Sequence, residues 1–551
     1  MSFVGNITQL IRKKYFNRFE EASKNPVKAQ WEKLSEILSK NENTEFGKNY
    51  GFWKIHSVSD YQKALPILTY ADLKPYVEKM LEGQKNILTH QEPLFYGMTT
   101  GSTGSSKFTP ITKDYRDEYQ TVVQSFIYYI YKDHPKAFDG KALYFTGSAK
   151  KQKSPSGVDC GTMSGFNFRN LPKLLQSFYA LPYELTDFKD SFSKFYCMVL
   201  LSIPQNITLI TAITGAPVVS FAKTLINNAE RLIKDIHDGT LDKDLVLTEE
   251  ERAFMQKKHK ANPQLAKKLE EIMKKNNGVL KPMDVWNNIE LLVCWKASNA
   301  GGFIKDLENL FGKELPIRDA IYSATEGWCN IPYSDEIIGG PLAINAHFYE
   351  FIEENDLDNN ILLIDQLEQN KKYKILYTTS GGIYRYDIGD ILEVVGMYNK
   401  TPVVKFVRKT GQTCNIAGEL ITDAHITQAI MNTKEKYDIS IPFYCAVPNQ
   451  ESFPPYYDLL IELPNVNSEN NKEICKYIDE QISEINCDYK SLREDNELNP
   501  ISLKLLEKES MNTYIQEQVK NGADEGQIKP LVLSLDMNKL TNLKILEEVK
   551  L

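Results

Sequence analysis

Apolar side chains near the amino terminus recur at the spacing of an α-helix. Over residues 15–40, Phe19, Trp31, Leu34 and Leu38 fall on one helical face, and polar residues occupy the positions between them. This pattern predicts an amphipathic helix. We interpret its apolar stripe as a core-packing face rather than a surface for a partner, because a helix at the surface of a globular domain needs such a stripe.

Farther along the chain, short apolar runs alternate with longer helical stretches. The runs expected to form strands are 142–148, 206–215, 289–295 and 316–324. The stretches expected to be helical include 217–237 and 249–275. Strands that alternate with helices favour a mostly parallel sheet covered on both faces, so the predicted fold class is α/β.

The pattern changes between residues 340 and 407, where short strand-like runs follow one another closely. This spacing is typical of a β-meander or a barrel-like sheet. Beyond residues 408–412 a smaller α+β unit begins, with two strands and a long polar helix from Ser468. We therefore expect a large domain at 1–406 and a small, mobile domain at 407–551, joined by a hinge near Phe406–Lys409.

Composition narrows the class of protein. A chain of 551 residues exceeds what one core usually covers, which predicts two or more domains. The net charge of −8 argues against a general binder of nucleic acid or anionic membrane. Eight scattered cysteines without a CxxC pair indicate reduced thiols and a cytoplasmic protein, and the histidines lack the spacing of metal ligands. The chain shows neither a secretory signal nor an apolar run long enough to span a membrane.

Residues 99–107, Thr-Thr-Gly-Ser-Thr-Gly-Ser-Ser-Lys, are the first candidate for chemistry. Glycines let backbone N–H groups approach a polyphosphate without a Cβ in the way, hydroxyls add donors, and Lys107 adds a positive charge. The segment does not have the register of a Walker A loop. By itself it is compatible with a phosphate loop and with a flexible surface turn.

Two later segments change that balance. Residues 322–327, Tyr-Ser-Ala-Thr-Glu-Gly, follow a strand-like run and offer an aromatic ring for a purine and a carboxylate for Mg²⁺. Residues 384–390, Tyr-Arg-Tyr-Asp-Ile-Gly-Asp, place Asp390 after a glycine, where a carboxylate is suited to accept hydrogen bonds from both ribose hydroxyls. Each segment alone is also compatible with an ordinary turn.

In this order, the three segments resemble the phosphate-loop, adenine-side and ribose-side motifs of the adenylate-forming superfamily. Within it, the chain resembles the Gretchen Hagen family of acyl-acid amido synthetases, and its bacterial-type members more than the plant enzymes. The segments that carry this narrower likeness are 41–52, 65–88, 378–390, 418–421 and 526–530. The resemblance implies a large domain of sheets and helices with a small mobile α+β domain.

The resemblance also implies an activity. ATP adenylates a carboxylic acid with the help of Mg²⁺, and an amine, usually that of an amino acid, displaces AMP to form an amide. The residues that would hold the β- and γ-phosphates are Thr99, Thr100, Gly101, Ser102, Thr103, Gly104 and Lys107. The residues that would flank the adenine and α-phosphate are Tyr322, Ser323, Ala324 and Thr325.

The remaining implied roles concern the metal, the ribose and the small domain. Glu326 would bind Mg²⁺, and Asp390 would hold the ribose. Phe406 and Arg408 would sit at the hinge, with Arg408 reaching the ribose or a phosphate. Lys529 would be the catalytic cation of the small domain; its surroundings depart from the family pattern, so Lys520 and Lys544 remain alternatives.

The acyl substrate is defined less sharply. Residues 214–225 resemble the family's segment that lines the acyl site, so Val218, Val219 and Phe221 are substrate candidates or core residues. Residues 161–168, rich in Gly, Ser and Phe, are a pocket lining or a loop. Two other activities stay open: an acyl-CoA ligase of the adenylate-forming type, and a nucleotide-binding protein without catalysis.

Overall fold

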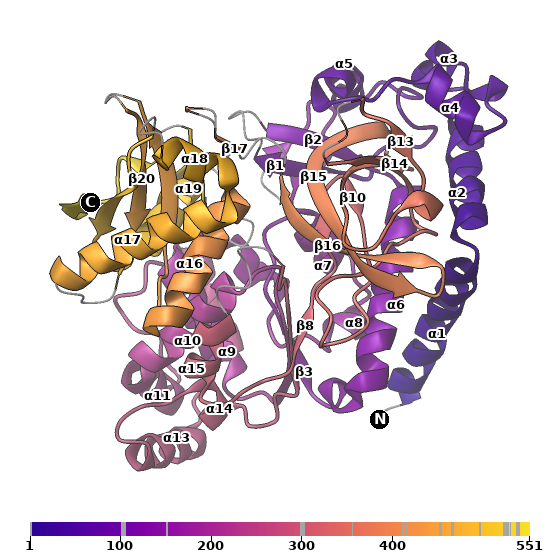
Figure 1. Ribbon diagram of the computed structural model, residues 1–551. Coiled ribbons are helices and arrows are strands. Elements are labelled where there is room, and N and C mark those ends of the chain that lie inside the picture. The colour runs from indigo at the N-terminus through magenta and orange to yellow at the C-terminus, as the bar shows by residue number, and fades with distance from the viewer. Residues whose placement is uncertain are drawn as a thin grey trace. The chain divides into compact units, whose positions relative to one another are not determined.

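The computed structural model describes residues 3–100, 106–149, 152–297, 304–354, 356, 358–409, 413–414, 416–417, 419, 421–450, 454–463, 468–494, 498–521, 528, 531–535 and 540–551. The chain divides into two compact units. The first contains residues 1–388 and 392–406, and the second contains 389–391 and 407–551. Figure 1 shows the elements of both units, and each unit is described in turn.

The predicted amino-terminal helix is present as two helices, α1 (Phe3–Lys24) and α2 (Pro26–Asn41). Pro26 has no N–H to continue α1, and the Asn25 side chain accepts the N–H of Lys28, so the chain ends one helix and begins another. Phe19, Leu34 and Leu38 are buried as predicted, and Trp31 is half-buried. Helix α1 packs along α6 (Lys113–Asp133) at the outer side of this unit (Figure 1).

The predicted parallel sheet is present at the centre of the first unit. It has the strand order β3 (Lys141–Tyr144), β6 (Ile207–Thr211), β7 (Leu291–Cys294), β8 (Ile317–Asp319), and neighbouring strands are parallel throughout. All four strands therefore end at the same edge. Ligands of open α/β sheets bind outside this carboxyl edge, which makes the residues that follow the strands the first place to look for a site.

The helices around this sheet are shorter than the sequence pattern suggested. The stretch 217–237 forms α10 (Ala216–Asn227) and α11 (Ala229–Asp238), and 249–275 forms α12 (Glu249–Lys258) and α13 (Pro263–Lys275). The other helices of this unit are α3 (Glu45–Asn49), α4 (Val58–Ala64), α5 (Tyr70–Leu81), α7 (Met163–Arg169), α8 (Lys173–Gln176), α9 (Ser191–Ser202), α14 (Pro282–Val285) and α15 (Ile304–Phe311). Short 3-10 turns occur at 52–54, 135–138, 183–187 and 364–366.

A second sheet carries the glycine-rich segment. Its strand order is β2 (Ser106–Ile111), β1 (Phe95–Thr100), β5 (Asp159–Gly161), β4 (Gln152–Lys153). Strands β1 and β2 are antiparallel, with Thr100 opposite Ser106 at the end of the ladder. Residues 101–105 therefore connect two paired strands. Strand β5 lies parallel to β1 on its other side, and α7 begins two residues after it.

The close-spaced strands form a third, six-stranded sheet, ordered β11 (Gly340–Pro341), β16 (Thr401–Lys409), β15 (Ile383–Tyr398), β14 (Lys372–Thr379), β12 (Phe348–Glu353), β13 (Ile361–Leu362). The consecutive strands β14, β15 and β16 are neighbours, as a meander requires. The barrel-like alternative is wrong: within the described residues the sheet is open, because its outer strands β11 and β13 have two residues each and do not pair with one another.

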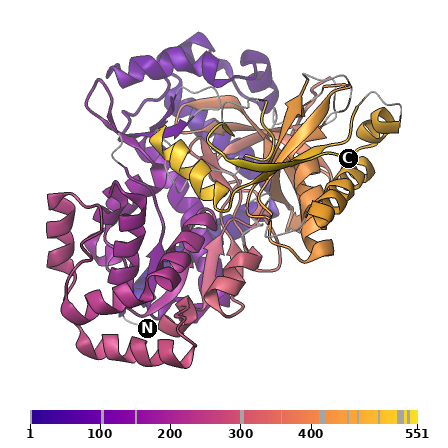
Figure 2. The same cartoon turned by 90° about the vertical axis from the view of Figure 1, so that its left-hand side faces the viewer.

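The second unit is a compact α+β structure of its own. A four-stranded sheet has the order β19 (Tyr444–Asn449), β20 (Tyr456–Ile461), β21 (Ser502–Leu506), β22 (Ile545–Val549), and β17 (Thr413–Cys414) pairs with β18 (Ile421–Thr422). The helices are α16 (Asp423–Tyr437), α17 (Ser468–Ile485), α18 (Cys487–Glu494) and α19 (Ser510–Lys520). Figure 2 shows orange helices of this unit against its orange and yellow strands. One apolar cluster, which includes Ile430, Leu459 and Ile478, joins sheet and helices.

Candidate active site

Aromatic rings meet at the carboxyl edge of the parallel sheet. Tyr322 follows β8 and Trp295 follows β7, and their rings stack with centroids 5.9 Å apart. Phe406 of β16 packs on both rings, at 5.1 Å from Tyr322 and 5.2 Å from Trp295. All three side chains are buried. Two of the predicted residues, Tyr322 and Phe406, are thus brought together, and Trp295 is a member of the group that the sequence analysis missed.

The predicted metal-binding segment is a tight hairpin. Strands β9 (Ser323–Ala324) and β10 (Gly327–Trp328) are antiparallel, so Thr325 and Glu326 form the two-residue turn between them. The Tyr115 hydroxyl of α6 donates to the Thr325 carbonyl at 2.7 Å, which fixes the turn to the helix. Helix α6 therefore determines where the Glu326 carboxylate lies.

The strand before the phosphate loop packs directly on this turn. A Cβ added to Gly97 of β1 would lie 2.2 Å from Thr325 Cγ2, far inside van der Waals contact. Position 97 therefore accepts only glycine while Thr325 keeps its place. The structure thus brings the first and second motifs together through Gly97 and Thr325.

Glu326 is 7% exposed and shares its surroundings with Tyr70 and Lys107. Burial raises the pKa of Tyr70, and the nearby Glu326 carboxylate raises it further. The Tyr70 hydroxyl accepts the N–H of Phe108 at 2.8 Å, and Lys107 Nζ lies 5.5 Å from the Tyr70 ring centroid. The Lys107 cation and the Glu326 carboxylate therefore both lie close to Tyr70, which the sequence analysis did not single out.

A buried charge network supports the same hairpin. Glu118 of α6 is 3% exposed; it lies 2.9 Å from Lys33 Nζ and 3.1 Å from His347 Nδ1. Burial alone would raise the pKa of Glu118, but Lys33, His347 and Ser380 lower it to about 2. His347 Nε2 accepts the N–H of Trp328 at 3.1 Å, so its proton is on Nδ1, facing Glu118. The network connects α2, α6, the hairpin and the Ser380 segment.

The third motif is held by a buried ion pair. Arg385 has φ 43°, a left-handed conformation that is uncommon for a residue with a side chain. Its Nε donates to Glu350 Oε2 at 2.8 Å, and its Nη1 donates to the carbonyls of Gln62 and Leu65. These bonds hold the carboxyl end of α4 against β15.

The predicted ribose-binding carboxylate lies farther along β15. Asp390 is buried and belongs to the second compact unit, where its Oδ1 lies 2.6 Å from Lys409 Nζ. Gly389 before it has φ 73°, a left-handed conformation, but β15 continues through this position and no tight turn forms there. Arg408 donates to the Lys409 carbonyl at 3.2 Å. Burial raises the pKa of Asp423 to about 6, although the positive charge of Arg408 acts to lower it.

Several predicted residues fall outside what the structure describes. These are Gly101, Ser102, Thr103, Gly104 and Lys529; for Thr99 and Thr100 only the backbone of β1 is described. Of the two lysine alternatives, Lys520 ends α19 and is exposed, and Lys544 donates to Glu507 at 3.1 Å.

The acyl-site candidates are largely core residues. Val218 and Phe221 of α10 are completely buried, and Phe221 stacks on Trp286 at 5.4 Å and packs edge-on against Phe145 at 5.5 Å. Val219 is half-buried. The apolar pattern of α10 therefore reflects packing under the parallel sheet.

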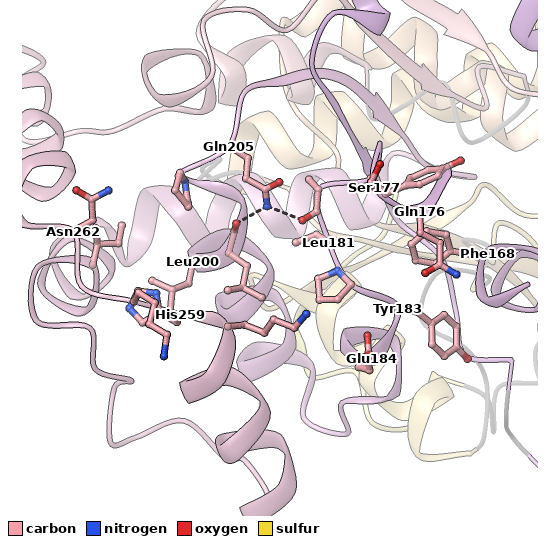
Figure 3. A pocket seen from close by; sticks show the side chains of 18 of the residues that line it. Phe168, Gln176, Ser177, Leu181, Tyr183, Glu184, Leu200, Gln205, His259 and Asn262 are labelled. Carbon is pink, nitrogen blue, oxygen red and sulfur yellow. Dashed lines mark hydrogen bonds between the residues drawn. The ribbon is translucent and has the colours of Figure 1, made fainter. Parts of the chain in front are cut away.

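An open cavity of about 920 Å³ lies elsewhere in the first unit (Figure 3). Residues 176–187 line one side, and residues 258–262 and the end of α9 line the others. Figure 3 shows Gln205 donating to two backbone carbonyls at its wall, those of Ala180 and Leu201. None of the residues predicted to bind nucleotide lines it, so we do not assign ATP to this cavity.

Comparison with known proteins places these motifs in a family. Residues 15–317 match the GH3 family N-terminal domain, 340–409 its central domain, and 424–538 its C-terminal domain. The chain belongs to the GH3 family. In GH3 terms, the parallel sheet and the glycine-rich hairpin fall in the N-terminal domain, and the meander with Asp390 falls in the central domain.

GH3 relatives match nearly the whole chain. The jasmonoyl–L-amino acid synthetase JAR6 of Nicotiana attenuata is 23% identical over 542 residues, which cover 94% of this chain and 93% of the relative. The indole-3-acetic acid-amido synthetase GH3.3 of Arabidopsis thaliana is 22% identical over 536 residues, which cover 93% of this chain and 90% of the relative.

Solved structures show the same fold. The GH3.15 acyl acid amido synthetase superposes with a TM-score of 0.86 at 19% identity, covering 97% of each chain. A 2-hydroxyisobutyryl-CoA ligase in the postadenylation state superposes with a TM-score of 0.50 at 11% identity, covering 96% of this chain and 90% of that one. The fold is therefore that of the GH3 synthetases within the adenylate-forming architecture. Among the helices of the described segments, none has the length and apolar character of a membrane span.

Proposed function

We propose that this GH3 protein uses ATP to convert a carboxylic acid into an acyl-adenylate and passes the acyl group to the amine of an amino acid. The observation that carries the proposal is the match of all three GH3 domains in order along the chain. The protein is then an ATP-dependent ligase that forms a carbon–nitrogen bond and releases pyrophosphate and AMP.

In the adenylation step, the first unit supplies the groups that bind and neutralise the phosphates. Thr99, Thr100, Gly101, Ser102, Thr103, Gly104 and Lys107 hold the β- and γ-phosphates. Thr325 faces the α-phosphate from the neighbouring turn. Because Gly97 and Tyr115 fix the Thr325 turn before the reaction, Thr325 stabilises charge on phosphorus without a reorganisation cost.

Glu326 fits a magnesium ligand of the kind found in nucleotide sites. Mg²⁺ is commonly held there by one or two carboxylates together with substrate phosphates and water. The described residues contain no group of three or more His, Cys, Asp or Glu placed to enclose a metal, which agrees with a site completed by ATP. Bound there, Mg²⁺ would neutralise charge on the phosphates.

Different residues are assigned to the adenine and to the ribose. Ser323 and Ala324, with the Tyr322 ring on its Trp295 and Phe406 support, form the adenine side. Asp390 accepts hydrogen bonds from the ribose hydroxyls. Lys409, which forms an ion pair with Asp390, directly follows Arg408 in the chain. Lys529 of the small domain is the cation for adenylation. Movement of that domain about 406–409 then removes Lys529 and admits the amine.

Transfer of the acyl group to coenzyme A is the second candidate. The fold is also shared by a CoA ligase, so architecture alone does not choose the acceptor. The names of the GH3 relatives favour amino acids, and the two reactions differ in whether a thiol is consumed or an amide appears.

The Mg²⁺ assignment can be tested with Glu326→Gln. This variant should lower acid-dependent ATP–pyrophosphate exchange by about 100-fold, because a neutral amide is a poor Mg²⁺ ligand, and should need more Mg²⁺ for half-maximal rate. Glu336→Gln, which changes an exposed carboxylate of the same domain, is the matched control. An unchanged Mg²⁺ requirement in Glu326→Gln would remove Glu326 from the metal site.

A further inference from the structure

Three buried polar side chains near the proposed active site have groups that lack a hydrogen-bond partner. Asn167 of α7 is 7% exposed, and neither its amide nitrogen nor its amide oxygen has a hydrogen-bond partner among the described residues. The hydroxyls of Thr146, which follows β3, and Ser164, which is one turn before Asn167 on α7, also lack a partner, and the Tyr144 hydroxyl beside Thr146 does not meet hydrogen-bond geometry.

This concentration of unpartnered groups is costly. A buried polar group without a hydrogen bond destabilises the folded protein, and native proteins contain few of them. Helix α7 cannot easily turn away to relieve the cost, because a Cβ on Gly165 would lie 2.2 Å from the Gly147 carbonyl oxygen. The polar groups are therefore held in place by tight packing, as in a site built for a ligand.

Aromatic rings surround these polar groups. Phe168 packs on Tyr179 at 4.9 Å and on Tyr144 at 5.6 Å. Tyr119 of α6 interacts electrostatically with Tyr144, Tyr179 and Arg116. The Asn167 side chain lies beside the Tyr119 hydroxyl, but Asn167 and Tyr119 do not meet hydrogen-bond geometry. Phe168 and Tyr179 also line the open cavity of Figure 3, so the cluster adjoins space within the same unit.

The cluster is close to the groups assigned to the reacting phosphate. The Tyr119 ring lies 4.9 Å from that of Trp328, two residues after Glu326. Tyr115, one helical turn before Tyr119, donates to the Thr325 carbonyl. Thr146 follows β3 at the same sheet edge at which Tyr322 follows β8. Along α6, Tyr115 at the Thr325 turn and Tyr119 beside Asn167 therefore connect the two places.

We propose that Asn167, with Thr146, binds a hydrogen-bonding substituent of the acyl substrate, so that the acid is one that carries a hydroxyl or carbonyl group on its body. This inference rests on the proposed function and names the substrate class of that site. Asn167 offers donors and an acceptor, and Thr146 offers one of each, which suits a hydroxyl or carbonyl better than a hydrocarbon. Sites of this kind reject analogues that lack the polar group, because their own buried groups are then left unpaired.

The test is acid-dependent ATP–pyrophosphate exchange with matched acids. The pairs are benzoate with its hydroxybenzoates, phenylacetate with its hydroxyphenylacetates, and hexanoate with 5-hydroxy- and 5-oxohexanoate. We expect kcat/KM at least 10-fold higher for a polar member of at least one pair. Equal kcat/KM within every pair would overturn the inference while leaving adenylation intact. No exchange with any acid would instead refute the proposed function, and the inference with it.

Variants assign the preference to these residues. Asn167→Leu should reduce the ratio of kcat/KM within the preferred pair to less than 3-fold, and Thr146→Val should reduce it partly. Asn170→Ala, which changes an exposed amide at the end of the same helix, should keep the full ratio. If Asn167→Leu fails to fold, Thr146→Val carries the test. A full ratio in the folded variants would overturn the assignment.

Discussion

Glu118 is the buried carboxylate that links several elements around the candidate site. It neutralises Lys33, lies 3.1 Å from His347 Nδ1 and accepts a hydrogen bond from the Ser380 hydroxyl of the third motif. A carboxylate with a folded pKa of about 2 adds stability that is complete above its unfolded pKa and is lost as pH falls toward 2. This loss should amount to about 3 kcal/mol between pH 5 and pH 2.

Glu118→Gln should lower the free energy of unfolding by about 3–5 kcal/mol at pH 7, because the buried Lys33 then loses its buried counter-charge and keeps only the exposed Glu36. The measurement is urea unfolding of the wild type and the variant between pH 7 and pH 3, where the variant should lose part of the wild-type pH dependence. Glu36→Gln is the control: Glu36 also contacts Lys33, but it is exposed and should cost about 1 kcal/mol or less. Similar losses in both variants would contradict this account of Glu118.

Gly97 allows a test of the contact between the first two motifs. Gly97→Ala should destabilise the protein by about 1–3 kcal/mol, since its Cβ collides with Thr325 Cγ2. Thr325→Ser removes that methyl group, so the double variant should recover most of the loss. Thermal unfolding of the four proteins in this mutant cycle measures the coupling. Strictly additive effects would show that the two side chains do not meet.

At the residue scale, sequence motifs predicted the candidate binding residues but not the buried residues that pack around them. Lys107, Glu326 and Asp390 stand beside glycines or hydroxyls in short segments, and that local pattern is visible in the sequence. Glu118, His347 and Trp295 stand alone among unrelated neighbours, and they meet only because distant elements fold together. Only the strand-like run that Trp295 ends could have drawn attention to it.

Among the elements, β15 depends on a contact far away in the sequence. Arg385→Ala should cost about 3–5 kcal/mol, because Glu350 is left buried without its counter-charge, with only the Gln62 amide as a donor, and the carbonyls of Gln62 and Leu65 lose a donor. Chemical denaturation checks the loss. Lys374→Ala removes a more exposed ion pair with Asp387 on the same sheet and should cost about 1 kcal/mol or less. Equal costs would mean that the buried pair does not anchor the strand.

Element type was more predictable than element length. The predicted strands of the parallel sheet and of the meander are present, since apolar runs of that kind fit buried pleated surfaces. The helices were predicted too long because Pro26, and the 259–262 segment before Pro263, interrupt an apolar periodicity that continues beyond them. Sheet closure depends on which edges pair, and a local pattern does not contain that information.

At the scale of the whole molecule, the proposal requires the two units to change their arrangement about residues 406–409. Lys409→Pro restricts the backbone there, so it should lower kcat for amide formation at least 10-fold with little change in the Kd for ATP. Lys409→Ala is the control, because it removes the same contact with Asp390 without the backbone restriction. Equal effects of the two variants, or equal losses in kcat and in ATP affinity, would contradict a hinge at this place.

The most direct test of the central claim is mass spectrometry of a reaction that contains ATP, Mg²⁺, a panel of carboxylic acids, a pool of amino acids and coenzyme A, with pyrophosphate release followed in parallel. The account predicts pyrophosphate release that depends on an acid and a new mass equal to acid plus amino acid minus water. A thioester mass in place of the amide would assign the protein to the CoA ligases. ATP binding without pyrophosphate release for any acid would contradict an adenylating function altogether.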